Sequence, residues 1–124
     1  EQRRRLGEAK AAFLRETDRL SEEDANRLLA PGRPPVSQLR ANGELFSVPH
    51  HGEQYPAFQI SNGAPVPGLR ALIHLFRGES AWGLALWLSG PSGWLSGTRP
   101  MDLLQESPAA VVEAARSTMR PLDA

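Results

Sequence analysis

Basic and polar side chains gather between Asp24 and Glu44, an interval that contains no acidic residue. Arginine can read guanine edges in the major groove of DNA, and glutamine can read adenine edges. Three arginines give only a small electrostatic footprint, because each phosphate contact releases about one counterion. The interval is therefore a candidate DNA-binding segment, and solvation of a polar helix face is the alternative explanation. Its candidate residues are Arg27, Arg33, Ser37, Gln38 and Arg40.

The other chemistry-bearing residues form no enzyme motif. No nucleophile motif, phosphate-binding loop or spaced carboxylate pair is present, so the sequence predicts a protein that is not an enzyme and binds no cofactor. His50 and His51 stand near Glu53 but have no cysteine beside them, and we predict no metal site there. His74 lies in an apolar segment and is expected to be packed, with one satisfied ring nitrogen.

Length and composition limit the possible classes of protein. A chain of 124 residues forms one compact domain, or two very small ones that share a core. Basic and acidic residues number 14 each, so no global field attracts nucleic acid or a membrane. The chain has no cysteine and no apolar run approaching the ~20 residues of a membrane span. We therefore expect a cytoplasmic protein without a membrane partner, and a homodimer stays open.

The first third of the chain is predicted to be helical. An amphipathic pattern places Leu6 and Phe13 on the buried side of the first helix. Ser21 is a good N-cap for the second helix, and Gly43 suits the C-terminal end of the third. The expected helices cover residues 3–20, 22–29 and 35–42.

Two strand candidates follow, residues 44–48 and 54–60, with residues 49–53 as the tip of a hairpin. Two short helices joined by a glycine-containing turn and followed by a hairpin predict a winged helix-turn-helix, whose third helix would be the recognition helix. Asn62-Gly63 marks the next turn, and residues 64–67 are expected to form a stiff connector. We place a boundary there, between a winged-helix-like part, residues 1–62, and a helical part, residues 63–124.

The C-terminal part contains all three tryptophans. A helix is expected from about Gly68 to Phe76, and a second helix carries Trp82 and Trp87. After a Gly/Pro loop, Trp94 and Leu95 are expected to return to the core. Proline at a first helical position predicts two further helices, which begin at Pro100 and Pro108. The fold class is therefore mostly α with one small β-hairpin (α+β).

The stretch from Leu95 to Leu104, Leu-Ser-Gly-Thr-Arg-Pro-Met-Asp-Leu-Leu, resembles a known signature. It is similar to the L-x-G-x-x-P-L-x-L-L pattern in the toxin-binding domain of Xre/MbcA/ParS-type antitoxins. The upstream stretch Tyr55-Pro56-Ala57-Phe58-Gln59 also resembles a box found in stand-alone members. The resemblance covers roughly Phe46 to Arg120, and Gln105 to Pro108 departs from it because relatives have a glycine-containing turn there.

The resemblance implies a small antitoxin whose C-terminal region packs on a RES-type toxin, an enzyme that consumes NAD, and blocks its active site. An arginine beside a proline-capped turn can fork to a carboxylate or phosphate of a partner, or brace Asp102 locally. The competing classes are a DNA-binding regulator that binds operator DNA without a toxin partner, and an adaptor domain. By position, the implied partner-binding residues are Trp94, Arg99, Met101, Arg116 and Arg120, with the tail to Ala124.

Overall fold

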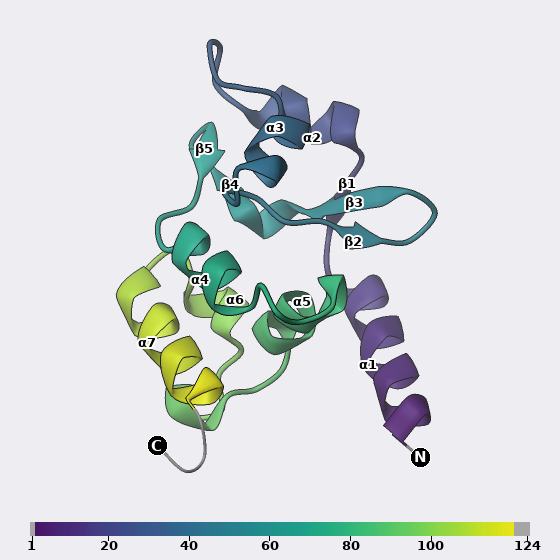
Figure 1. Ribbon diagram of the computed structural model, residues 1–124, viewed down its shortest axis with the longest axis vertical. Helices are drawn as coiled ribbons and strands as arrows, with labels where there is room; N and C mark the ends of the chain where they lie inside the picture. The colour runs from purple at the N-terminus through teal and green to yellow at the C-terminus, as the bar shows by residue number, and fades with distance from the viewer. Residues whose placement is uncertain (1, 121–124) are drawn as a thin grey trace.

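The computed structural model describes residues 2–120 and begins with a winged-helix connectivity (Figure 1). A helix and a strand precede two short helices, and two more strands follow them. The three strands form an antiparallel sheet in the order β1-β3-β2, so the first strand pairs with the last. These elements are α1 (Gln2–Glu16), β1 (Arg19–Leu20), α2 (Glu22–Leu28), α3 (Val36–Ala41), β2 (Val48–Pro49) and β3 (Glu53–Pro56).

Local capping explains where α2 and α3 begin. The Ser21 hydroxyl accepts a hydrogen bond from the backbone N–H of Asp24 at 3.1 Å, which confirms the predicted N-cap. At the start of α3, the Asn26 side chain accepts from the N–H of Val36 at 2.8 Å. Residues 29–35 connect the two helices, a longer link than the three- or four-residue turn of most helix-turn-helix motifs.

The first predicted helix is too long at its C-terminal end. The helix ends at Glu16, and Arg19 and Leu20 form β1 instead, paired with Pro56 and Tyr55 of β3. Pairing with a distant strand therefore overrides the local helical pattern. Leu6, which was expected on the buried side, is 47% exposed because only the C-terminal half of α1 lies against the rest of the fold.

The wing is shorter than predicted, because an amide side chain replaces part of the strand ladder. Gln59 is fully buried in η1 (Ala57–Gln59), a short 3-10 helix that interrupts the expected strand over residues 54–60. Its side chain accepts from the N–H of Phe46 at 2.7 Å and donates to the carbonyl of Phe46 at 2.8 Å. It also donates to the carbonyl of Pro56 at 3.2 Å. Gln59 thus joins the two sides of the hairpin.

Replacing Gln59 with leucine is expected to lower the free energy of unfolding by about 2 kcal/mol. The buried N–H and C=O of Phe46 would lose their partner, and each such loss costs roughly 1–3 kcal/mol, offset in part by the apolar side chain. Urea denaturation followed by far-UV circular dichroism measures the change. Gln105→Leu, at an exposed position between helices, should change stability by no more than about 0.5 kcal/mol. Equal losses in the two variants would contradict the bridging role.

A second small hairpin lies where a stiff connector was expected. Strands β4 (Ile60–Ser61) and β5 (Ala64–Pro65) pair in antiparallel fashion around Asn62 and Gly63. Both turn residues have positive φ, 55° and 78°, as a tight Asn-Gly hairpin turn requires. The predicted turn is therefore confirmed, and the connector prediction is wrong for Ala64 and Pro65, which form β5. The boundary predicted after residue 62 falls inside this turn.

Within residues 63–120, five helical segments dominate the C-terminal part, as expected for a mostly α fold of the α+β class. The last two of them begin at Pro100 and Pro108, as predicted, although Ser107 makes no side-chain capping bond to the last helix. Helix α4 packs against α7, and the segment η2 also contacts α7. The segments are α4 (Leu69–Leu75), α5 (Ala81–Ser89), η2 (Gly93–Leu95), α6 (Pro100–Leu103) and α7 (Pro108–Met119).

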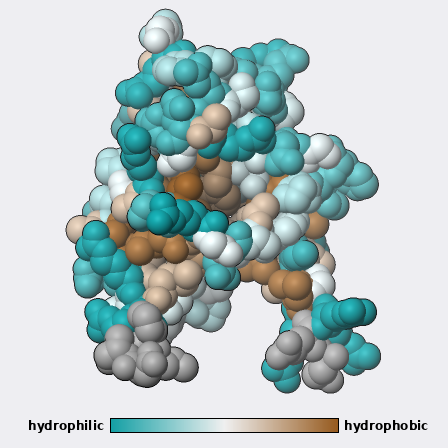
Figure 2. All heavy atoms as spheres, viewed as in Figure 1, coloured by the Kyte–Doolittle hydropathy of each residue, from teal (hydrophilic) through white to brown (hydrophobic). Residues whose placement is uncertain are grey.

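One core joins the two parts of the chain. The rings of Phe13 in α1 and Trp82 in α5 meet edge to face, with 5.7 Å between their centroids. Val48 of β2 and Leu72 of α4 belong to the same cluster of buried side chains. Figure 2 shows apolar residues across the middle of one face, below the hydrophilic helices at the top. The fold therefore buries its apolar surface between the winged-helix part and the C-terminal helices.

Candidate functional site

Trp94 is the most exposed large apolar residue among those that the structure describes. Its side chain is 63% exposed, whereas Trp82 is 8% exposed. Trp87 packs on Phe76, with 5.5 Å between ring centroids, and its indole N–H donates to the Thr118 hydroxyl at 3.2 Å. The prediction that Trp94 and Leu95 return to the core is therefore wrong for Trp94. Leu95 packs against the core as predicted, and the indole of Trp94 stays outside.

Backbone hydrogen bonds close the loop that carries Trp94. The N–H of Ser92 donates to the carbonyl of Thr98 at 3.1 Å, and the N–H of Gly97 donates to the carbonyl of Ser92 at 2.8 Å. Ser96 and Gly97 both adopt the left-handed conformation, with φ of 56° and 82°. This pair of left-handed residues reverses the chain directly after η2. Trp94 is thus presented on a loop with its own internal bonding.

Arg99 braces the start of α6. Its guanidinium forms a bidentate pair with the Asp102 carboxylate, at 2.9 Å from Nε to Oδ2 and 3.0 Å from Nη2 to Oδ1. A third carboxylate oxygen, from Glu16 of α1, lies 3.9 Å from Nη1. The hydrogen bond to Asp102 raises the pKa of Arg99, and the charges of Asp102 and Glu16 act in the same direction. The local brace that the sequence left open is therefore present.

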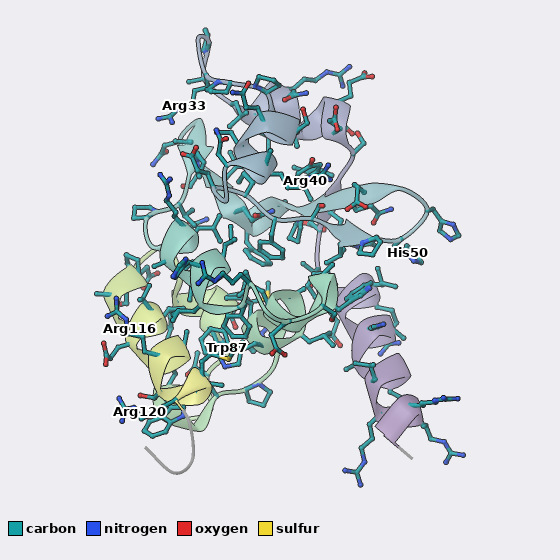
Figure 3. The ribbon with its side chains drawn as sticks, in the orientation of Figure 1. Arg33, Arg40, His50, Trp87, Arg116 and Arg120 are labelled. Atoms are coloured by element: carbon teal, nitrogen blue, oxygen red, sulfur yellow. The ribbon has the colours of Figure 1, made fainter. Side chains whose placement is uncertain are left out.

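The other predicted partner-binding residues lie on two separate elements. Met101 is half-buried and lines a hollow of about 320 Å³ together with Phe58 and Thr17. Arg116 and Arg120 are exposed at the C-terminal end of α7 (Figure 3), and Arg116 lies 3.3 Å from the Glu113 carboxylate. The rest of the predicted tail, residues 121–124, is outside the described part of the chain.

Two of the predicted DNA-binding arginines are held by carboxylates. Arg27 pairs with Glu23 at 2.5 Å and with Asp24 at 2.8 Å on its own helix. Arg40 lies toward the β2–β3 hairpin (Figure 3), where it donates to the Ser47 hydroxyl at 3.1 Å and lies 3.5 Å from the Glu53 carboxylate. Pairing with an acid reduces the attraction of each guanidinium for phosphate.

The remaining three predicted DNA-binding residues have different surroundings. Arg33 is exposed on the loop between α2 and α3 (Figure 3), and Gln38 is exposed on α3. Ser37 is half-buried on the same helix. Of the five predicted DNA-binding residues, Arg33 and Gln38 are therefore the two that are exposed and, within residues 2–120, not paired with a carboxylate.

Arg40 also contacts a buried tyrosine that sequence reasoning missed. Its guanidinium carbon lies 5.9 Å from the centroid of the Tyr55 ring, and Tyr55 is fully buried. The Tyr55 hydroxyl has no hydrogen-bond partner among the described residues. Burial raises the pKa of Tyr55, and the nearby Arg40 charge opposes that rise. Arg40 thus connects α3 to the sheet, a structural role that its position in the sequence did not reveal.

The prediction for His74 is also wrong. Its side chain is exposed on the outer face of α4, because Leu69 and Leu72 take the buried positions of that helix. Its Nδ1 lies 3.5 Å from Nη1 of Arg77. At the wing, the rings of His50 and His51 lie 4.4 Å apart. Within residues 2–120, no cluster of three or more histidine, cysteine or acidic side chains could hold a metal ion.

Comparisons with known proteins add no family assignment. Searches against protein-family models, curated proteins and solved structures found no match to the chain. Among the described helices, none combines the length and the apolar character needed to cross a membrane.

Proposed function

We propose that this chain is the antitoxin of a type II toxin–antitoxin pair and neutralises a RES-type, NAD-consuming toxin in the cytoplasm. It acts by protein–protein association through its C-terminal half, without catalysis and without a cofactor. The proposal starts from the resemblance of residues 95–104 to the antitoxin signature.

One observation carries the proposal: Trp94 is exposed on a loop that is closed by its own backbone bonds. Tryptophan is strongly enriched among the residues that dominate binding energy at protein interfaces. A side chain presented by a preorganised loop loses less conformational freedom on binding than one on a flexible segment. Trp94 therefore suits the role of an anchor that fills an apolar pocket of the toxin.

The other predicted partner-binding residues would supply the border of such an interface. Met101 supplies further apolar surface, while Arg99 supplies a guanidinium whose charge is already balanced by Asp102. Helix α7 contacts η2 and contributes Arg116 and Arg120. An apolar anchor with arginine at its border has the composition typical of interface cores and rims.

Arg99→Ala is expected to weaken toxin binding about tenfold. This corresponds to a loss of binding free energy just above about 1 kcal/mol, a typical effect of truncating an interface residue. The chain would be co-expressed with a RES-type toxin, and complex formation, cellular NAD content and growth would be measured. Arg27→Ala is the matched control, because Arg27 also pairs with two carboxylates but lies on α2. A folded Arg99→Ala variant that binds and protects like the wild type would remove Arg99 from the interface. Absence of any complex with the wild-type chain would contradict the antitoxin proposal itself.

We propose a DNA-binding transcriptional regulator as the second candidate function. The observation that favours it is the strand order β1-β3-β2 around α2 and α3, the connectivity of a winged helix. In this proposal Arg33 and Gln38 contact DNA, since both are exposed on or next to α3. The double variant Arg33→Gln/Gln38→Ala would then abolish duplex binding, which fluorescence anisotropy of a labelled duplex measures.

A further inference from the structure

Helix α4 and the turn that follows it expose a row of nitrogen-bearing side chains. Arg70, His74 and Arg77 follow one another at spacings of four and three residues, and all three are exposed. The opposite face of the helix is held in the core by Leu69 and Leu72. Arg70 and His74 are therefore fixed on a packed helix, Arg77 lies in the turn directly after it, and all three are directed to solvent.

Two hollows flank this row. The larger has a volume of about 620 Å³, lies between α4 and α7, and is lined by Arg70, His74 and Arg116 over an apolar floor of Ala71 and Leu75. The smaller, about 320 Å³, lies between α4 and the end of α3. Arg70 and His74 line both hollows, so they form a ridge between them. The row thus extends toward the winged-helix part of the chain.

The two arginines of the row are not neutralised by acids. Among residues 2–120, no carboxylate lies within ion-pair distance of Arg70 or Arg77. The arginines on α2 and α7 and at the start of α6 differ, because each has at least one carboxylate partner. An exposed guanidinium without a carboxylate partner can donate two parallel hydrogen bonds to a phosphate.

We propose that the outer face of α4 and the turn after it, with Arg70, His74 and Arg77, bind the phosphate backbone of duplex DNA without reading its sequence. A ridge between two open hollows fits a continuous chain of phosphates better than it fits a single enclosed anion. The smaller hollow includes Asn42 and Gly43 at the end of α3, so DNA on the winged-helix part could continue onto α4. The inference goes beyond the antitoxin proposal. It shares DNA binding with the second proposal but places the charge contact on α4.

The test is fluorescence anisotropy of a labelled random-sequence duplex of about two helical turns, titrated with the full chain at several salt concentrations. The variant Arg70→Gln/Arg77→Gln removes two charges from α4. The control Arg3→Gln/Arg15→Gln removes two charges from exposed positions on α1. Circular dichroism melting checks that every variant is folded.

For the wild type, a plot of the logarithm of the binding constant against the logarithm of the salt concentration is expected to have a slope of about −3. For the α4 variant, the slope should be about −1, because two charges are removed. At fixed low salt, the α4 variant should bind at least tenfold more weakly, and the α1 control should stay within about twofold of the wild type. Equal weakening of both variants would contradict the inference, because it would show a general charge effect. Competition by poly-glutamate as strong as that by unlabelled duplex would also overturn it, in favour of an acidic protein partner.

A third variant separates this inference from the regulator proposal. Arg33→Gln/Gln38→Ala changes the α3 contacts and leaves α4 intact. If only this variant lost DNA binding, the regulator proposal would stand and the α4 inference would be wrong. If the wild-type chain bound no duplex at low salt, both would fail. Neither result would alter the antitoxin proposal, which is tested separately by measuring complex formation with the toxin.

Discussion

Trp82→Ala is expected to lower the free energy of unfolding by about 3–5 kcal/mol, the usual range for truncating a buried tryptophan. Trp82 is 8% exposed and meets Phe13 of α1 edge to face. The ammonium of Lys10 lies 5.3 Å from the centroid of the same ring. The side chain therefore attaches α1 to α5, and its removal opens a cavity between the two parts of the chain. Because the free energy of unfolding of a whole protein is only about 5–15 kcal/mol, this loss is a large fraction of it.

Chemical denaturation followed by both tryptophan fluorescence and far-UV circular dichroism measures this effect. Trp94→Ala is the matched control, since it removes the same side chain from a solvent-exposed site and should change stability by no more than about 0.5 kcal/mol. The wild-type chain should give coincident midpoints with the two probes, because both parts share one core. A loss below about 1 kcal/mol for Trp82→Ala, or separate midpoints, would contradict this view of the core.

The helix starts could be predicted because they depend on neighbouring residues. Ser21 caps α2, and Pro100 and Pro108 occupy first helical positions, as local rules require. The turn at Asn62 and Gly63 follows from the same kind of local chemistry. Each of these features involves residues close together in the sequence, so no knowledge of the tertiary fold is needed.

The mistaken predictions concern contacts between distant residues. Strand β1 exists because Leu20 pairs with Tyr55, and the wing is short because Gln59 bonds to Phe46. Whether Trp94 or Leu95 faces the core depends on how η2 is placed against α7. Hydrophobic pattern alone cannot decide such cases, because both orientations satisfy the local sequence.

The charge pairing was partly readable from the sequence. Glu23 and Asp24 precede Arg27 by four and three residues, the spacing at which side chains on a helix interact. The same rule groups Arg70, His74 and Arg77, a row that the sequence reasoning overlooked in favour of the segment around α3. The pairing of Arg40 with Glu53 depends on the fold of the wing and could not be predicted.

Trp94→Ala is expected to weaken the complex with a RES-type toxin about thirtyfold or more, which corresponds to ~2 kcal/mol for an interface hot spot. The physical reason is the loss of a large apolar surface that the free chain already exposes to water. Trp94→Phe should retain part of the affinity, because it keeps an aromatic ring at the same position. Stability should be unchanged in both variants, so that a change in affinity reports on the interface alone.

The most direct test of the proposed function is therefore the dissociation constant of the purified chain and a RES-type toxin, measured by isothermal titration calorimetry for the wild type and Trp94→Ala. Thermal melting of each free protein serves as the control for folding. The antitoxin proposal predicts a wild-type complex and a Trp94→Ala complex at least about thirtyfold weaker, with the same melting temperature for both free chains. A Trp94→Ala variant that binds the toxin as tightly as the wild type would contradict the proposed interface.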